Sequence, residues 1–412
     1  MSAIERPTGV RPVGVVLSLL EDLYLDLHAH PELSGREERT ASVIAERLRV
    51  LGVEVTANVG GTGVVGVIEN GSGPTVMIRS ELDALPVHEQ TALSYASTVQ
   101  GVMHACGHDL HLVGLVGAAE LLVRSERTWR GTVVIVAQPA EETLSGAAAL
   151  LADGLYTRWP VPDVALAQHV VPLPVGVVAH GPSTTWSSAQ FRADLATEPT
   201  HSAISGPGFD LVGRLGLLDA LVRDTAVKQG ATGGLYALHT GTCANVTPAT
   251  ATALGSVRAP ALATVDAVLA DVRSQLAELG AVRAEMTVTG SAPAVAVDSE
   301  LMSDLVSEHT RAFGRGRVWT DYISYAADDF SLYGTEFLPD GSRVRLGYWM
   351  FGGIDPRTWR AARDDGSVVP ANHSDRFTPE LTSLRAAVVA MTTAARSQLV
   401  SHRDADPEGT TP

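Results

Sequence analysis

The first half of the chain alternates between short apolar segments and longer segments with helical spacing. Residues 131–138 and 164–170 are of strand length and mostly apolar, whereas residues 37–51 and 108–123 have the length and spacing of helices. Strands without a polar face belong to sheets that are covered on both sides. The alternation therefore predicts an α/β fold with a mostly parallel central sheet flanked by helices.

A second pattern interrupts the first near residue 186. From there to residue 294 the expected elements run strand, helix, strand, strand, helix, strand, which is the order of a ferredoxin-like α+β unit. A chain of 412 residues is also too long for one ordinary core. We therefore expect one domain made of residues 1–185 and 295–412, and a smaller inserted domain made of residues 186–294.

Polar side chains stand at or just after the ends of the expected buried strands. They are Asp83, Glu141, Glu142 and His169. Open α/β sheets build their sites at the carboxyl ends of their strands. The sequence therefore places its candidate chemistry at one edge of the sheet.

The stretch GVMHACGHDLH holds three histidines, a cysteine and an aspartate just before an apolar helix. Cys106 and His108 are two residues apart, so one turn can direct both toward a common ion, and thiolate and imidazole suit Zn²⁺ or a related first-row metal. The alternative is a buried free cysteine beside a helix-capping Asp109. These residues alone leave both interpretations open. We expect His104 and His111 to be neighbours of the site rather than ligands.

Glu141 and Glu142 are adjacent, so their side chains point in different directions. One can bind a metal while the other handles a proton. The alternative, a solvated helix start, is weakened because the pair follows a buried strand, where unpaired carboxylates are costly. Three further histidines, taken singly, do not indicate a metal site. His169 is typical of a histidine in the core, and His201 and His373 are typical of histidines in loops.

Composition excludes several classes of function. The 46 acidic residues outnumber the 30 basic ones, for a net charge of −16, and no basic cluster is present to bind phosphates. The apolar run at residues 13–20 is too short for a membrane span, and no small-residue cleavage site follows it. Two cysteines, Cys106 and Cys243, cannot form a disulfide framework. We expect a cytoplasmic protein with no nucleic-acid and no membrane partner.

Blocks spread along nearly the whole chain, in the right order, resemble those of a known family. They are LHAHPELSGREERTA, ELDALPVHEQT, MHACGHDLH, QPAEETLSGAAALLADGL, AQHV, NVTP and ANHSDRFTPEL. The family is that of the metal-dependent amidohydrolases, which include hippurate hydrolases, N-acyl-amino-acid aminoacylases and indole-acetyl-amino-acid hydrolases. Zinc carboxypeptidases and dipeptidases are relatives. The resemblance implies an α/β catalytic domain with an inserted ferredoxin-like lid.

The resemblance also implies a site for two divalent metal ions. The implied ligands are Cys106, His108, Glu142, His169 and His373, with the cysteine in place of the bridging carboxylate of the carboxypeptidase relatives. Zn²⁺ is the expected metal, and Mn²⁺ or Co²⁺ are the alternatives.

Other roles follow from the same resemblance. Glu141 would be the catalytic carboxylate, and His201 of the lid would reach the scissile carbonyl. Asn245 matches a lid asparagine associated with substrate binding. Asp83 and Asp109 are expected to stand behind the ligands and orient their imidazoles.

The implied reaction is hydrolysis of an amide bond in an N-acyl amino acid or related N-acylated amine, by metal-activated water with Glu141 as general base. Dipeptidase or carboxypeptidase activity is the main alternative, and N-carbamoyl-amide hydrolysis a weaker one. A catalytically silent ligand-binding relative is disfavoured, because such a protein would be free to lose Glu141 or a ligand. A homodimer formed through the lid is a further expectation.

Several departures from the family pattern leave every implied ligand in place. RSELDALP stands where RADxDALP is common, which introduces Ser80 and Glu81. Asp328 stands where a glutamate is usual, and Cys243 where small residues are typical. The loop around His201 lacks the usual glycines and second histidine. These changes predict a specialised substrate.

Overall fold

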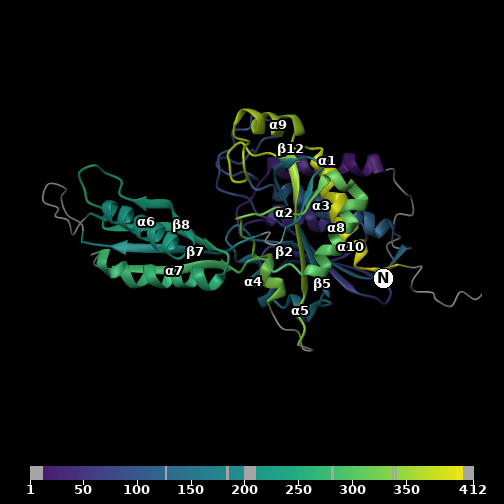
Figure 1. The fold of residues 1–412 in the computed structure, drawn as a ribbon, viewed down its shortest axis with the longest axis horizontal. Helices are drawn as coiled ribbons and strands as arrows, with labels where there is room; N and C mark the ends of the chain where they lie inside the picture. Colours follow the sequence, from purple (N-terminus) through teal and green to yellow (C-terminus); the bar gives the residue numbers. More distant parts are fainter. Residues whose placement is uncertain are drawn as a thin grey trace, which may run out of the picture.

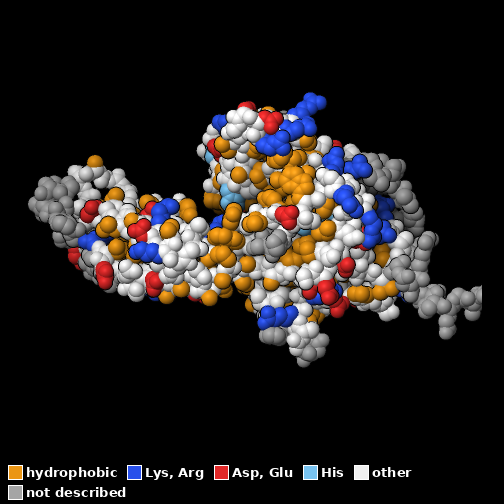
Figure 2. All heavy atoms as spheres, viewed as in Figure 1, with side chains coloured by type: hydrophobic (Ala, Val, Ile, Leu, Met, Phe, Trp, Pro, Cys, Tyr) orange, Lys and Arg blue, Asp and Glu red, His pale blue; other side chains and the backbone are white. Residues whose placement is uncertain are grey.

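The computed structural model describes residues 13–125, 128–181, 185–198, 210–279, 283–335, 338 and 341–401, and the structural statements below concern these residues. Figure 1 shows a large lobe and a smaller, elongated lobe that extends from it. In the space-filling view of the same face, hydrophobic side chains gather where the two lobes meet (Figure 2).

The large lobe is built on one sheet with parallel strands at its centre. Its strands are β1 (Glu54–Val59), β2 (Gly63–Asn70), β3 (Thr75–Glu81), β4 (Trp129–Gln138), β5 (Val164–Pro174), β6 (Val178–Ala179), β11 (Val318–Trp319), β12 (Arg345–Ile354) and β13 (Val400–Ser401). The order is β1-β2-β4-β3-β5-β12-β6-β11, with β13 beside β4. The pairs β4–β3, β3–β5 and β5–β12 are parallel, so the predicted mostly parallel sheet is confirmed.

Helices cover both faces of this sheet because its central strands are apolar on both sides. They are α1 (Val13–Ala29), α2 (Glu38–Val50), α3 (His108–Arg124), α4 (Gly146–Ala152), α5 (Leu155–Arg158), α8 (Ser299–Phe313), α9 (Pro356–Asp365) and α10 (Ser383–Ser397), with short 3₁₀ turns η5 (Arg315–Arg317) and η6 (Asp329–Gly334). Along β4, Val133 and Ile135 pack into the core that includes α1, α3 and α10. Val134 and Val136 pack into the opposite core, with α4 and η6.

The small lobe has the predicted ferredoxin-like order. Its elements are β7 (Ser187–Ala196), α6 (Leu211–Lys228), β8 (Thr232–Thr240), β9 (Thr250–Ala259), α7 (Leu262–Gln275), η4 (Leu276–Leu279) and β10 (Arg283–Ala292). The antiparallel sheet runs β10-β7-β9-β8, and its apolar face packs against α6 and α7. The limits of an independent domain at residues 186 and 294 remain a prediction. Across the described ranges, no helix is both long and apolar enough to cross a membrane.

Two histidines buried in the large lobe should make stability sensitive to acid. His309 Nε2 donates to the Ala390 carbonyl (3.1 Å), and His309 Nδ1 lies 2.9 Å from His180 Nε2. Burial lowers the pKa of His180 to about 3 and that of His309 to about 4. Unfolded histidines titrate near pH ~6.5, so below that pH the unfolded state binds more protons. Stability should therefore be complete above about pH 6.5 and decline as the pH falls toward 4.

The variant His309→Gln tests this. Glutamine keeps a donor for Ala390 and an acceptor for His180 but does not titrate. Between pH 7 and pH 5 we expect the wild type to lose about 2 kcal/mol more free energy of unfolding than the variant. Urea unfolding at both pH values measures the difference, and equal losses in the two proteins would contradict it.

Candidate metal centre

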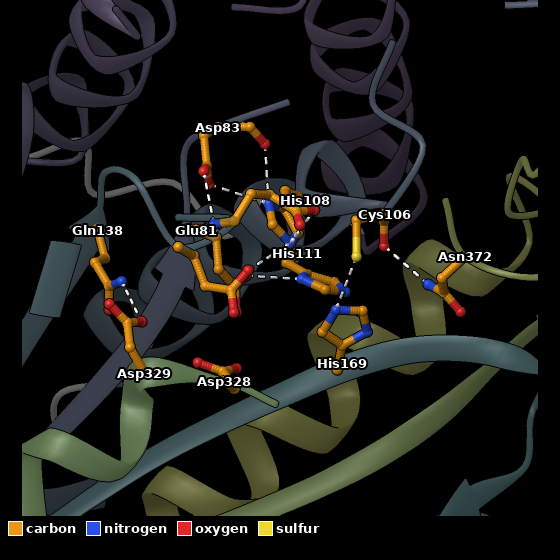
Figure 3. Close-up of polar contacts among 12 residues, drawn as sticks. Glu81, Asp83, Cys106, His108, His111, Gln138, His169, Asp328, Asp329 and Asn372 are labelled. Carbon is orange, nitrogen blue, oxygen red and sulfur yellow. Dashed lines mark hydrogen bonds and ion pairs between the residues drawn. The ribbon is translucent and has the colours of Figure 1, made fainter. Parts of the chain in front are cut away.

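The residues expected at the site come together at the carboxyl-terminal edge of the parallel strands. Glu141 and Glu142 lie in the turn after β4, and His169 lies within β5. Cys106 comes just before α3, and His108 is the first residue of that helix (Figure 3). Each of these except His108, together with His373, lines one cavity of about 180 Å³.

His373 reaches the cavity from the loop between α9 and α10. Its backbone N–H donates to the Ala105 carbonyl (2.8 Å), and its φ of 71° is unusual for a residue other than glycine. The neighbouring Asn372 uses its Nδ2 to donate to the carbonyls of Cys106 (3.1 Å) and Val170 (3.0 Å). These bonds tie the loop to both β5 and the start of α3, which fixes the imidazole beside the other candidate ligands.

Cys106 is the centre of the arrangement. Its Sγ lies 3.3 Å from His169 Nε2 and 3.3 Å from His373 Nε2. Possible ligand atoms of Cys106, His108 and His169 lie within 4.8 Å of one another, and so do those of Cys106, Glu142 and His373. The cysteine is the one residue common to the two triads. A cysteine that only filled space would not need two imidazole nitrogens directed at its sulfur, so the arrangement favours two cation positions that share a thiolate.

Buried atoms without partners support the same interpretation. His108 Nδ1 donates to the Asp83 carbonyl (2.9 Å), and its Nε2 is buried without a hydrogen-bond partner among the described residues. His169 Nδ1 donates to the Val170 carbonyl (2.7 Å), which turns Nε2 toward the cavity. Glu142 Oε1 is also buried and unpartnered within that part of the chain. Since such atoms are costly to leave unpaired, the donor set fits divalent cations.

The electrostatics of the cavity favour added positive charge. Burial lowers the pKa of His108, but the hydrogen bond to Asp83 and the charge of Glu81 outweigh it and raise the pKa to about 10. Burial and the nearby Glu142 raise the pKa of the Cys106 thiol well above its usual value. Nearby carboxylates contribute to both shifts, and a bound cation would balance their negative charge.

Glu141 has the environment of a group that exchanges a proton. It is 5% exposed, and its Oε2 lies 3.8 Å from His108 Nε2. Burial and the charges of Asp328 and Glu142 raise the pKa of the Glu141 carboxyl well above its ordinary value. A carboxyl with a raised pKa can both accept and return a proton near neutral pH.

The two aspartates expected behind the ligands differ. Asp83 faces His108 with its carbonyl and with Oδ1 (3.3 Å), and its Oδ2 accepts from the Glu142 backbone N–H (2.9 Å). Asp109 instead accepts from His28 Nδ1 with Oδ2 (2.6 Å) and from Leu110 N with Oδ1 (2.8 Å). The expectation that Asp109 orients a ligand imidazole is therefore corrected. One step along a helix turns a side chain by about 100°, which points this carboxylate toward α1.

Two further expectations concern the small lobe. His201 lies outside the described residues. Asn245 is exposed, in the loop between β8 and β9, and does not line the cavity. Their roles in catalysis and substrate binding stay predictions.

His111, which was expected to neighbour the site, forms a buried pair with Glu81 that the sequence did not predict. His111 Nδ1 donates to Glu81 Oε2 (2.7 Å), and His111 Nε2 accepts from Val170 N (2.8 Å). Both ring nitrogens are therefore occupied, so His111 is placed as a neighbour. Figure 3 shows the pair between the ligand cluster and Asp328. Glu81 and Asp328, which depart from the family pattern, both bind the fully buried Arg79.

The small lobe adds polar groups to the cavity that sequence reasoning also missed. Gln190 of β7 donates through Nε2 to the Glu142 carbonyl (2.6 Å). Arg258 of β9 lies opposite Ser188 of β7 in the small-lobe sheet. Among the described residues that line the cavity, it is the one arginine, and no lysine is present. Within the described ranges it has no ion-pair partner. No local pattern in the sequence distinguishes this partly buried arginine from other arginines on strands.

Comparison with known proteins gives consistent results. The sequence model described as Peptidase family M20/M25/M40 matches residues 77–353. An N-acetyl-L-cysteine deacetylase of Bacillus subtilis is 34% identical over 240 residues, which cover 56% of this chain and 57% of that protein. A hippurate hydrolase of Campylobacter jejuni is 41% identical over 140 residues, 34% of this chain and 36% of the relative. The matched regions thus span about a third to somewhat more than half of these relatives.

Solved structures match over a greater length. A Bacillus subtilis protein described as a dinuclear metal binding peptidase from the M20 family superposes with a TM-score of 0.68 and 26% identity, and the match covers 93% of this chain and 98% of that one.

Proposed function

Since this chain belongs to peptidase family M20/M25/M40, we propose that it is a metal-dependent amidohydrolase that cleaves N-acyl amino acids or related N-acylated amines. One observation carries the proposal: the Cys106 sulfur is shared by two triads of possible metal ligands, with the buried Glu141 beside them. The relatives named as a deacetylase and a hippurate hydrolase support this substrate class.

Five residues would hold two divalent cations. Cys106, His108 and His169 form one set, and Cys106, Glu142 and His373 the other. Thiolate and imidazole donors make Zn²⁺ the expected ion, with Mn²⁺ or Co²⁺ as alternatives. When bound, such cations supply Lewis acidity, which polarises the scissile carbonyl and lowers the pKa of water.

The protein's own groups would manage the protons and hold the site in place. Glu141 would take a proton from the attacking water and return it to the leaving amine. Asp83 holds the His108 ring and the Glu142 backbone in fixed positions. In the small lobe, His201 is proposed to face the developing oxyanion and Asn245 to bind substrate. A cytoplasmic location and a homodimer through this lobe remain predictions from the sequence.

Arg258 offers a partner for a substrate carboxylate. It lines the cavity together with apolar side chains, among them Leu144, Tyr322 and Met350, which can accept an acyl group. A free carboxylate distinguishes an N-acyl amino acid from a simple amide. The guanidinium would bind that carboxylate through charge-assisted hydrogen bonds.

Arg258→Ala should therefore act selectively. On N-acyl amino acids we expect kcat/KM to fall about 10- to 100-fold, the loss of one charge-assisted bond. An analogue whose carboxylate is replaced by a primary amide should be hydrolysed equally by wild type and variant. Arg192→Ala is the matched control, because Arg192 lies on β7 but is exposed and paired with Asp194. Equal losses on both substrates would contradict the assignment.

A substrate panel tests the proposed function. Purified protein is supplied with Zn²⁺, Mn²⁺ or Co²⁺ and assayed on N-acetyl and N-benzoyl amino acids, dipeptides and N-carbamoyl amino acids. We expect the N-acyl amino acids to be cleaved most efficiently. Faster cleavage of dipeptides would favour the peptidase alternative, and faster cleavage of carbamoyl compounds the carbamoylase one. No hydrolysis of any class with any metal would contradict the proposal.

A further inference from the structure

Glu37 is a fully buried carboxylate at the N-cap of α2 that does not cap its own helix. Its Oε1 accepts from the backbone N–H groups of Gly35 (2.8 Å) and Ala140 (2.9 Å). Its Oε2 accepts from the Thr62 hydroxyl (2.6 Å). The carboxylate therefore joins three segments of the chain, and one of them is the turn that carries Glu141.

The start of α2 is capped by a different residue. Glu32 accepts from the backbone N–H groups of Arg39 (3.1 Å) and Thr40 (2.7 Å) and from the Thr40 hydroxyl (2.8 Å). These are the orphan donors of the first helical turn, which a capping side chain ordinarily satisfies. The helix therefore does not depend on Glu37 for its cap, and the buried Glu37 side chain is available to the turn after β4.

That turn has a backbone that must be held in place. Ala140 and Leu144, on either side of Glu141, both have φ of 50°, a left-handed conformation that a side chain disfavours. The turn is closed by Leu144 N donating to the Glu141 carbonyl (2.7 Å) and Gly146 N donating to the Ala140 carbonyl (3.2 Å). A strained backbone conformation persists only where several contacts hold it in place. Glu37 supplies one such contact, because it binds Ala140, the first residue of this turn.

We propose that Glu37 is a positioning residue for catalysis: by binding the Ala140 N–H, it fixes the backbone that aims the Glu141 carboxylate into the metal centre. The inference rests on the proposed function, in which Glu141 is the general base. Glu142 has its own anchor, because its backbone N–H donates to Asp83 (2.9 Å). Loss of Glu37 should therefore disturb the base more than the metal ligand.

The variants Glu37→Ala and Glu37→Gln distinguish the effect of the Glu37 hydrogen bonds from the effect of its negative charge. The glutamine oxygen can still accept from Gly35 and Ala140 while its amide donates to Thr62, whereas alanine removes all three bonds. We expect Glu37→Ala to lower kcat about 30- to 100-fold, with KM changed less than about threefold. Its metal content, measured by atomic emission, should match the wild type. Glu37→Gln should stay within about threefold of the wild-type kcat.

Glu32→Ala is the matched control, since it removes the same number of hydrogen bonds from the same segment without touching the turn. It should lower Tm by a few degrees and leave kcat within about threefold. An equal loss of kcat in Glu32→Ala and Glu37→Ala would overturn the inference, and so would a Glu37→Gln enzyme as impaired as Glu37→Ala.

If the alanine variant does not fold, Glu37→Asp tests whether Glu37 positions the turn. It keeps the charge but is one methylene too short to reach Ala140, so its kcat should be about 10-fold below that of Glu37→Gln. Equal activity of these two variants would overturn the inference. A wild-type protein that hydrolyses no amide would contradict the proposed function instead, so the two failures are distinguishable.

Discussion

Glu141→Gln should retain both metal ions and lose about 10³-fold in kcat. The glutamine has nearly the same shape as the buried glutamate but cannot take a proton from water or return one to the leaving amine. The raised pKa of the Glu141 carboxyl, caused by burial and by Asp328, suits it to this exchange. Steady-state kinetics on an N-acyl amino acid, with metal content measured on the same sample, check the prediction.

The neighbouring carboxylate gives the contrast. Glu142→Gln alters a member of the triad of Cys106 and His373, so this variant should lose metal as well as activity. If Glu141→Gln keeps near-wild-type turnover, or if it loses metal as readily as Glu142→Gln, the two glutamates do not have the separate roles proposed here.

Cys106→Ala should have an effect of similar size through a different cause. The Sγ atom is the contact common to both triads, 3.3 Å from His169 Nε2 and 3.3 Å from His373 Nε2. Its removal should reduce the metal content to less than about one ion per chain and lower kcat/KM more than about 100-fold. Metal analysis after dialysis, followed by kinetics, provides the measurement.

The second cysteine provides a matched control. Cys243 is exposed, in the loop between β8 and β9, so Cys243→Ala should bind metal and turn over substrate like the wild type. A Cys106→Ala protein that still binds two metal ions would contradict the prediction, and Cys106 would then be a core residue that only fills space.

The fold followed from the sequence because its main determinants are local. Successive residues of β4, such as Val134 and Ile135, are apolar and pack into opposite cores, which is what a strand covered on both faces requires. The order of elements in the small lobe was likewise predictable from periodicity and turn signals. The limits of the inserted domain remain a prediction.

The candidate site was less accessible from the residues alone. Taken singly, Cys106 and Glu142 could each have been either a metal ligand or a structural residue. Only the resemblance of whole sequence blocks to a family indicated that they belong to one metal site. Arg258 and Gln190 were missed because their place in the cavity depends on how the small lobe sits on the turn after β4, which no short stretch encodes. Asp109 was misassigned because sequence adjacency to His108 does not show which way a helical side chain points.

We propose above all that amide hydrolysis by this chain depends on two cations, held by Cys106, His108, Glu142, His169 and His373. The most direct test is to strip the protein with a chelator and add back Zn²⁺, Mn²⁺ or Co²⁺ in known amounts while hydrolysis of an N-acyl amino acid is followed. We expect the stripped protein to be inactive and the rate to rise to a plateau at about two ions per chain. Undiminished hydrolysis by the stripped protein would contradict it.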